Sequence, residues 1–399
     1  MNPVSAQGPI RNNYLSGDAS VLLDLLRVLA CEMVVVSHII PLYLLYKNVK
    51  YDNSLIWMGP TNLGIMGVML FFFISGIVIS NSLFKKLQAG NYGFGSYFID
   101  RFSRIYSGLV PCLIIILALD ILIRAINAPL FYLLSPRFGT SSISIDIFLA
   151  NLLMLQMMPP FHIPRPPFAE LLWTLNIEWW LYMAFGWLIV FYKPKNMLKV
   201  KAMLGFLLFS LYPIYLAATN YRGTLVPVWF FGVLITAMMT RGIYAEQIRK
   251  YFKYLFPIAI ILIAIRMSID LHIGIIYYEY VLELLAGCAI LLAVINFNGK
   301  EEIFRGARLK GFIKAMASYS YTLYLLHVAM IAALLALDDI YGLSCPLPAF
   351  IAISLVLTNV VAYIVAYFTE MRYRRLAKWI KDKAEKARLR LLAPARPSV

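Results

Sequence analysis

Apolar runs, most of them long enough to cross a membrane, follow one another along almost the whole chain. They lie near residues 21–46, 63–83, 105–124, 143–158, 171–192, 200–218, 224–240, 254–270, 274–296, 315–337 and 348–369. An α-helix needs about 20 mostly apolar residues to cross the hydrocarbon core of a bilayer. Because 61% of the 399 residues are hydrophobic and only 14% are charged, an ordinary soluble core is excluded. The sequence therefore predicts an all-α, polytopic membrane protein.

The run near 143–158 is the weakest of these. It is shorter than the roughly 20 residues that a crossing requires, and it ends at Pro159 and Pro160. It also carries Asp146 and Asn151. If it crossed, the basic cluster that begins at Lys193 would lie outside, against the positive-inside rule. We therefore predict that this segment is re-entrant or interfacial.

The other ten runs predict a topology in which both ends of the chain are cytoplasmic. The basic clusters near 85–104, 193–201, 241–253, 300–314 and 372–396 then all lie inside. The outer loops hold only Lys47, Lys50, Arg124, Arg137, Arg165 and Arg222. The predicted organisation is a cytoplasmic tail at 1–20, one transmembrane domain at 21–376 and a basic cytoplasmic tail at 377–399.

Neither the charge nor the cysteines indicate nucleic acid or a metal. The net charge of +16 comes from residues between the apolar runs, where they set topology. The cysteines have no CxxC spacing and stand in apolar context, so we interpret them as small buried hydrophobes; they are Cys31, Cys112, Cys288 and Cys345. No signal-peptide pattern precedes the first run, which we expect to be retained.

The first run contains two ionisable residues, Arg27 and His38, eleven positions apart. On a helix this spacing places both on one face and separates them by about 16 Å along the axis. Charged and titratable groups inside a bilayer are costly and normally face the bundle interior. The pair is therefore a functional candidate, with Arg27 near the cytoplasm and His38 in the outer half. The alternative is a snorkelling arginine and a packed, hydrogen-bonded histidine.

Glu178, in the run near 171–192, is expected at the same depth as His38 under this topology. A carboxylate beside an imidazole fixes the ring tautomer and stabilises the imidazolium, which suits general base catalysis. A structural pair, or two separate buried polar groups, is the alternative. The neighbouring Trp173, Trp179 and Trp180 also fit an aromatic belt at the membrane interface.

Arg101 and Arg104 are three residues apart at the inner end of the third crossing helix, so they share a helix face. Two guanidinium groups there are able to clamp a phosphate. Ordinary positive-inside charge is the alternative. Ser75 lies in mid-span beside Gly76, and we keep it as a candidate nucleophile, although packing is the expected role of Gly76.

The last two crossing runs supply further polar residues. Tyr321, Tyr324 and His327 follow one another on successive turns, and structural hydrogen bonding is the favoured role of His327. Glu370 closes the final run on the cytoplasmic side, where it is placed to pair with Arg27 or with the Arg101 group, or to anchor the helix end. Arg266, near the outer end of its run, either contacts an external ligand or snorkels outward.

The order of these motifs resembles the acyltransferase 3 family of membrane acyltransferases. The motifs are LDLLR…H, GVMLFFFISG, RFSRIY, WTLNIEWWLY, SYSYTLYLLH and a final E…R. The likeness runs from Leu23 to Leu376. It implies an enzyme of the bacterial inner membrane that transfers an acyl group, most often acetyl, from cytoplasmic acyl-CoA. The implied acceptor is a hydroxyl of an extracytoplasmic glycan, a lipid-linked sugar or, in some members, an antibiotic.

The resemblance also assigns roles to single residues. His38 matches the family's essential histidine, Arg27 its first-span arginine and Glu178 the glutamate of an S-V-E segment. Arg101 and Arg104 match an R-x-x-R associated with acyl-CoA. This chain departs from the family where Asn176 and Ile177 precede the glutamate and Trp179 and Trp180 follow it, which puts the acceptor class in doubt. Residues expected to contact substrate are Trp173, Asn176, Arg266, Ser75, Tyr324 and His327.

The implied form is the stand-alone one, without an appended SGNH hydrolase-like domain, and no metal is implied. The expected partners are acyl-CoA, the glycan acceptor and membrane lipids; a homo-oligomer stays open, and nucleic acid is not expected. Two rivals come from other classes. One is a transporter or flippase of sugar lipids with His38 as a proton relay. The other is a structural subunit of a polysaccharide machine.

Overall fold

The structure is a computed structural model of the 399-residue chain. It describes residues 14–49, 60–89, 92–138, 142–156, 158–159, 162–191, 196–219, 225–269, 278–301 and 303–392. Within these ranges, the side chains of 60–62, 188–191, 196–199, 201–202, 266–269, 278–280, 388 and 390–392 lie outside the description.

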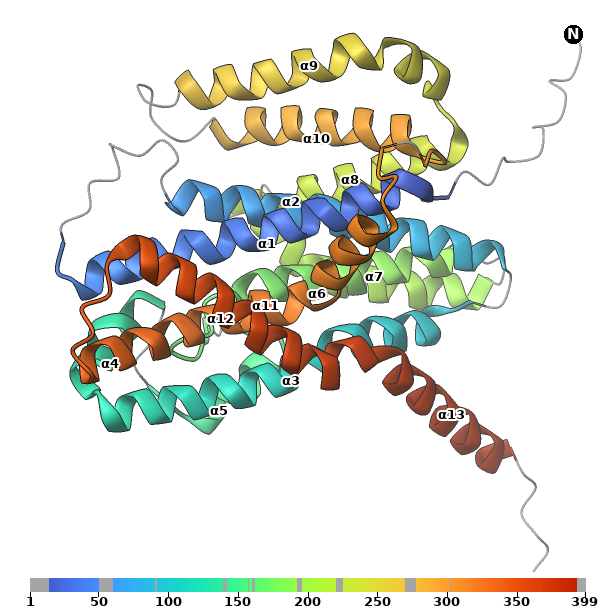
Figure 1. The fold of residues 1–399 in the computed structure, drawn as a ribbon. Coiled ribbons are helices and arrows are strands. Elements are labelled where there is room, and N and C mark those ends of the chain that lie inside the picture. The colour runs from blue at the N-terminus through green and yellow to red at the C-terminus, as the bar shows by residue number, and fades with distance from the viewer. Residues whose placement is uncertain are drawn as a thin grey trace, which may run out of the picture. The chain divides into compact units, whose positions relative to one another are not determined.

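The described part of the chain is helical, as the sequence predicts (Figure 1). One isolated β-bridge, between Gln156 and Ile163, is its only strand-like pairing. The helices are α1 (Gly17–Tyr46), α2 (Pro60–Gln88), α3 (Phe94–Ile126), α4 (Ala128–Leu134), η2 (Ser135–Phe138), α5 (Ile145–Leu152), α6 (Leu172–Phe191), α7 (Asn196–Thr219), α8 (Leu225–Arg241), α9 (Ala245–Ile269), α10 (Tyr278–Phe297), α11 (Ala307–Ile340), α12 (Leu347–Phe368), η3 (Glu370–Arg372) and α13 (Tyr373–Leu392).

The helices have the lengths and composition of a multi-pass membrane protein. Each run predicted to cross coincides with a helix. Among the described residues, five helical stretches are long and apolar enough to cross a membrane, namely Gly17–Tyr46, Leu63–Gln88, Phe94–Ile126, Ala307–Ile340 and Leu347–Ala387. Shorter apolar helices accompany them, including Leu225–Arg241 and Val281–Phe297. The number of crossings and their direction stay predictions.

The segment predicted not to cross forms α5, which has eight residues. Such a helix rises about 12 Å, far less than the roughly 30 Å of a hydrocarbon core. Tyr106 of α3 donates a hydrogen bond to the carbonyl of Leu152 at the end of α5, over 2.8 Å. The length of α5 therefore agrees with a re-entrant or interfacial element.

Four long helices contain an internal proline: Pro41, Pro111, Pro213 and Pro257. A proline removes one backbone hydrogen bond, and crossing helices tolerate it because neighbouring groups satisfy the freed carbonyl.

Apolar side chains on α9 face outward; Ile258, Ile261 and Leu262 are exposed. Such a surface suits contact with lipid rather than water.

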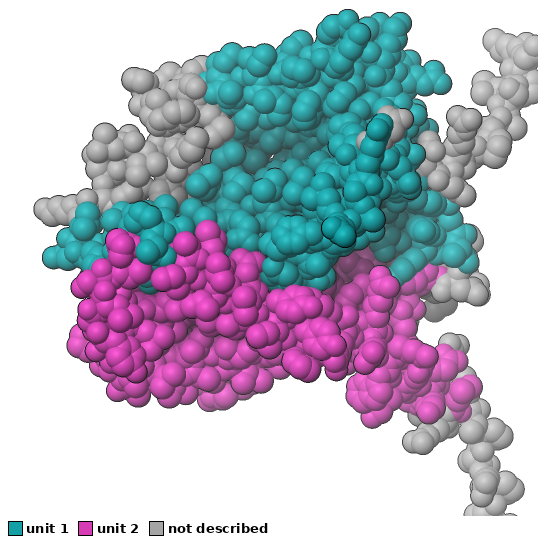
Figure 2. All heavy atoms as spheres, in the orientation of Figure 1, with its two compact units in different colours: residues 1–91, 213–320, 347–351 teal, residues 92–212, 321–346, 352–399 magenta. Residues whose placement is uncertain are grey.

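The chain forms two compact units, coloured separately in Figure 2. Unit 1 comprises residues 1–91, 213–320 and 347–351, and unit 2 comprises 92–212, 321–346 and 352–399. The boundary in α11 falls between Ser320 and Tyr321. Each unit is described by itself.

In unit 1, α2 packs on both α1 and α8, and α10 packs on α9. Gly76 of α2 and Gly232 of α8 allow the two backbones to approach closely. A Cβ atom built on Gly76 would lie 2.2 Å from the carbonyl oxygen of Trp229, and one on Gly232 would lie 2.4 Å from that of Phe73. The packing role expected for Gly76 is therefore confirmed.

In unit 2, α3 is the central element and contacts α4, α5, α6, η3 and α13. Tyr97 of α3 packs against Gly186 of α6, where an added Cβ would lie 2.5 Å from its ring. The same tyrosine donates a hydrogen bond to the carbonyl of Tyr182, over 3.1 Å. Both contacts hold the start of α3 against α6.

Candidate functional site

His38 lies in the C-terminal half of α1, and its side chain is partly buried. Its Nδ1 atom lies 2.8 Å from the carbonyl oxygen of Val34, one turn earlier. The hydroxyl of Ser37 lies 3.3 Å from the same nitrogen and donates to the same carbonyl over 2.6 Å. The ring is therefore held by its own helix.

The contact with Val34 favours one tautomer of His38. A carbonyl oxygen only accepts hydrogen bonds, so Nδ1 must carry a proton to bond with it. In the neutral ring the lone pair then resides on Nε2. A histidine in this state is able to accept a proton at Nε2, which is what a general base requires.

Arg27 lies on the same unbroken helix as His38, so the rise of about 16 Å between them follows from helix geometry. Its Nη1 atom is 3.6 Å from a carboxylate oxygen of Asp24, three residues earlier. About a quarter of each side chain is exposed, 22% for Arg27 and 25% for Asp24, so this pair is a weak local interaction.

Ser75, the candidate nucleophile, lies in α2 of unit 1. Its Oγ atom accepts a hydrogen bond from Nε1 of Trp229 in α8, over 3.2 Å. Trp229 is fully buried, which makes this contact part of the α2–α8 packing.

Glu178 and its neighbours lie on α6 in unit 2. The hydroxyl of Tyr182, one turn later, donates to the Glu178 carboxylate. Asn176 is fully buried, and its side-chain amide donates to the backbone carbonyl of Gln156. Trp173 is 9% exposed. Asn176 thus holds the segment that follows α5 against α6.

The polar residues of α11 in unit 2 are held by hydrogen bonds. The hydroxyl of Tyr324 lies 2.8 Å from that of Thr174 on α6. His327 is fully buried, and its Nδ1 atom lies 3.2 Å from the carbonyl of Leu323. Tyr321 donates to the carbonyl of Ile105 over 3.2 Å. These contacts fit the structural role favoured for His327.

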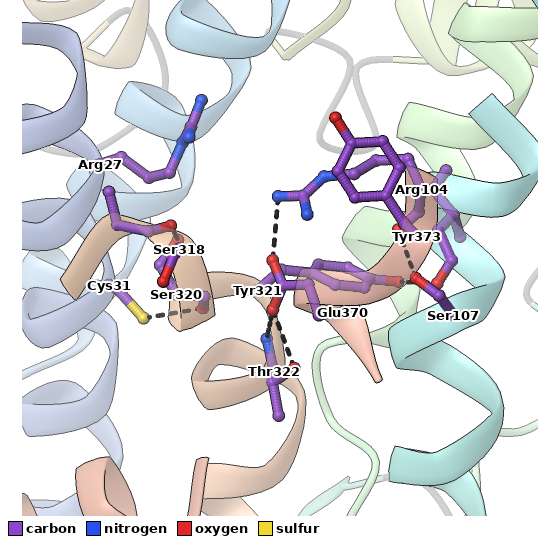
Figure 3. A network of polar contacts seen from close by, with 12 residues as sticks. Arg27, Cys31, Arg104, Ser107, Ser318, Ser320, Tyr321, Thr322, Glu370 and Tyr373 are labelled. Carbon is purple, nitrogen blue, oxygen red and sulfur yellow. Dashed lines mark hydrogen bonds and ion pairs between the residues drawn. The ribbon is translucent and has the colours of Figure 1, made fainter. Parts of the chain in front are cut away.

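Arg104 forms an ion pair with a buried carboxylate in unit 2 (Figure 3). Its Nη2 atom lies 2.9 Å from Oε1 of Glu370, which is fully buried. The other carboxylate oxygen accepts hydrogen bonds from the backbone N–H of Thr322, over 3.0 Å, and from its hydroxyl, over 2.8 Å. The ring of Tyr373 lies against the guanidinium, with its centroid 5.1 Å from Cζ. The pairing predicted between Glu370 and the Arg101 group is therefore present, through Arg104.

Arg101 has different surroundings from Arg104. Its guanidinium carbon lies 5.9 Å from the ring centroid of Tyr97, on the same helix. Its Nε atom is buried and has no hydrogen-bond partner among the described residues. The two arginines that the sequence groups on one face are therefore anchored differently, Arg104 by a carboxylate and Arg101 by an aromatic ring.

Several predicted partnerships stay predictions. His38 belongs to unit 1 and Glu178 to unit 2, so their pairing is one of them. Arg266 lies in α9, but its side chain is outside the described residues. Sequence reasoning did not select Thr322, Tyr373 or Tyr182 as neighbours of charged groups. Only the spacing of Tyr182, one turn after Glu178, gave a signal for such a contact.

The comparisons with known proteins agree with the motifs. The model of the acyltransferase domain family, acyltransferase 3, matches residues 21–367. No curated protein and no solved structure matches the chain. The matched residues run from Val21, near the start of α1, to Tyr367, one residue before the end of α12. The chain therefore belongs to the acyltransferase 3 family and is a membrane acyltransferase.

Proposed function

We propose that this membrane acyltransferase moves an acyl group, by preference acetyl, from cytoplasmic acyl-CoA to a hydroxyl of an extracytoplasmic glycan in the bacterial inner membrane. The proposal includes ten crossings with both ends of the chain inside, as the distribution of Lys and Arg predicts. That the protein transfers acyl groups follows from its membership of the family. The donor, the acceptor and the direction of transfer are our proposal.

The observation that carries the proposal is the 2.8 Å contact of His38 Nδ1 with the carbonyl of Val34, which favours the tautomer with the lone pair on Nε2. In the proposed reaction Nε2 takes the proton of the acceptor hydroxyl, and the alcohol oxygen attacks the thioester carbon. The C–S bond then breaks, an oxygen ester forms, and the CoA thiolate leaves and takes the proton from the imidazolium. Glu178 is proposed to stabilise the imidazolium that forms between these steps.

The donor side of the proposal rests on arginines. CoA carries phosphate groups, and guanidinium donors bind phosphate with two parallel hydrogen bonds. We assign this role to Arg101, Arg104 and Arg27. Acceptor contacts are assigned to Trp173, Asn176, Arg266, Ser75, Tyr324 and His327. An acyl-enzyme intermediate on a serine or tyrosine would use the same donor site.

Membranes that contain the protein, incubated with acetyl-CoA radiolabelled in the acetyl group, test this function. We expect label in the glycan fraction, and none when the protein is absent. A transporter or flippase of sugar lipids with His38 as proton relay would leave the glycan unlabelled. A structural subunit would show no loss of glycan modification when His38 or Glu178 is replaced. Mass spectrometry of the surface glycans would give the acyl mass and the acceptor.

Replacing Glu178 with glutamine is expected to lower the rate of transfer by about 10- to 100-fold, because the imidazolium loses its stabilising carboxylate. The amide still accepts a hydrogen bond from Tyr182, so the helix should stay folded. If Glu178 acts through His38, the double variant should be no slower than the His38 variant alone. Independent, multiplicative losses would contradict a shared role.

A further inference from the structure

We propose that Glu370 is a positioning residue, which holds the Arg104 guanidinium in the orientation that binds a phosphate of acyl-CoA. This inference rests on the proposed function, since it assigns a specific task within the donor site. The relevant residues all belong to unit 2 and lie on α3, α11, η3 and the start of α13.

The carboxylate of Glu370 is fixed by hydrogen bonds through one oxygen and pairs with Arg104 through the other. Oε2 accepts two hydrogen bonds from Thr322, one from the backbone N–H and one from the hydroxyl. Oε1 lies 2.9 Å from Nη2 of Arg104, an ion-pair contact without hydrogen-bond geometry. The side chain is fully buried, so it has little freedom to rotate away. A buried, doubly held carboxylate is a rigid reference point for the arginine that it contacts.

The guanidinium of Arg104 is held on one edge and one face. Glu370 contacts one terminal nitrogen, and the ring of Tyr373 covers a face. A guanidinium carries N–H donors on all three nitrogens in one plane, so donors remain for a second anion. The side chain of Arg104 is 29% exposed, whereas that of Glu370 is not exposed at all. The contacts therefore restrain the arginine while leaving part of it accessible.

The ion pair between Arg104 and Glu370 costs free energy to bury, and a gain in stability does not by itself explain it. Burying a carboxylate and a guanidinium loses hydration, and a buried ion pair is often no more stabilising than apolar residues of the same size. What such a pair does supply is a defined orientation for a flexible, long side chain. For phosphate, which Arg binds through directed donors, orientation sets the affinity.

A second ion pair on α3 provides a matched control. Nζ of Lys381 on α13 lies 2.6 Å from Oδ1 of Asp100, and Tyr92 donates to the other oxygen of the carboxylate over 2.7 Å. Burial of Tyr92, followed by this hydrogen bond to Asp100, raises the pKa of the Tyr92 hydroxyl. This pair also joins α3 to the C-terminal segment, yet it includes neither Arg101 nor Arg104.

The test measures transfer from two radiolabelled donors in membranes that carry the endogenous acceptor. Acetyl-CoA has the phosphates, and acetyl-pantetheine lacks them. Glu370→Gln keeps the shape and an acceptor for Thr322 but removes the charge that holds Arg104. We expect it to raise the KM for acetyl-CoA about three- to tenfold, with kcat within about twofold and the KM for acetyl-pantetheine unchanged. Asp100→Asn should change neither KM value.

An unchanged KM for acetyl-CoA, or an equal rise with both donors, would overturn the positioning role. If Glu370→Gln does not accumulate as folded protein, Thr322→Val decides the question, because it removes one of the two hydrogen bonds and keeps the charge. It should raise the KM for acetyl-CoA by a smaller factor and spare acetyl-pantetheine. A wild-type protein that transfers no label from acetyl-CoA would instead contradict the proposed function.

Discussion

Replacing His38 with glutamine should lower the rate of acyl transfer by a factor on the order of 10² to 10⁴, the range that a general base contributes. Glutamine retains an N–H donor for the carbonyl of Val34, so the local helix contact is preserved. It has no group that takes up a proton at neutral pH. The measurement is the initial rate of labelled acetyl incorporation into glycan, normalised to the amount of folded protein in the membrane.

His162 offers a matched control for this variant. It lies in the segment between α5 and α6, and its side chain is exposed. His162→Gln is expected to transfer acetyl at the wild-type rate. Full activity in His38→Gln would rule out the base assignment. A loss in both variants would indicate a general sensitivity to histidine replacement rather than a catalytic role for His38.

The positions of the helices were largely predictable, because a crossing helix needs a long apolar run whatever it packs against. The first run, 21–46, corresponds to α1 at Gly17–Tyr46, and the run at 315–337 to α11 at Ala307–Ile340. Helix α11 extends beyond its run at both ends, and α1 begins before its run. Polar residues continue a helix where it leaves the hydrocarbon, so hydropathy alone underestimates its length.

The partners of charged residues were predictable only in part. The sequence identified Glu370 as a partner for Arg27 or for the Arg101 group, because these ends were expected on the same side of the membrane. It did not distinguish Arg104 from the others, since that choice depends on how η3 packs against α3. The contribution of Thr322 was not predictable, because its backbone N–H is expected to bond within α11.

The segment after α5 shows another limit of sequence reasoning. Asn176, which departs from the family pattern beside Glu178, was predicted to contact substrate. In the structure its amide donates to the carbonyl of Gln156, and the side chain of Gln156 donates to the carbonyl of Leu172 over 2.8 Å. These bonds join residues that periodicity cannot relate, since the segment between them is irregular. A substrate contact for Asn176 stays a prediction. In the structure, its side chain holds this segment by a hydrogen bond.

Replacing Gly76 with alanine adds a single methyl group, yet it should destabilise the protein strongly. The new Cβ atom would lie 2.2 Å from the carbonyl oxygen of Trp229, which belongs to the backbone and cannot rotate away. The helices α2 and α8 would have to separate, and Thr236 would lose its 3.1 Å hydrogen bond to the carbonyl of Ile77. We expect a loss of about 1–3 kcal/mol or more, measured as a lower unfolding temperature of the detergent-solubilised protein.

Gly311→Ala separates this steric effect from the general effect of adding a methyl group to a helix. Gly311 lies inside α11, and a Cβ atom built there meets nothing within 4 Å. Alanine favours a helix over glycine by up to about 1 kcal/mol, so this variant should unfold at the same or a higher temperature. Equal unfolding temperatures for Gly76→Ala and the wild type would mean that α2 and α8 do not approach as closely as the structure has them. A loss confined to Gly76 would instead show that contact between the two backbones, rather than helix propensity, makes glycine necessary at this position.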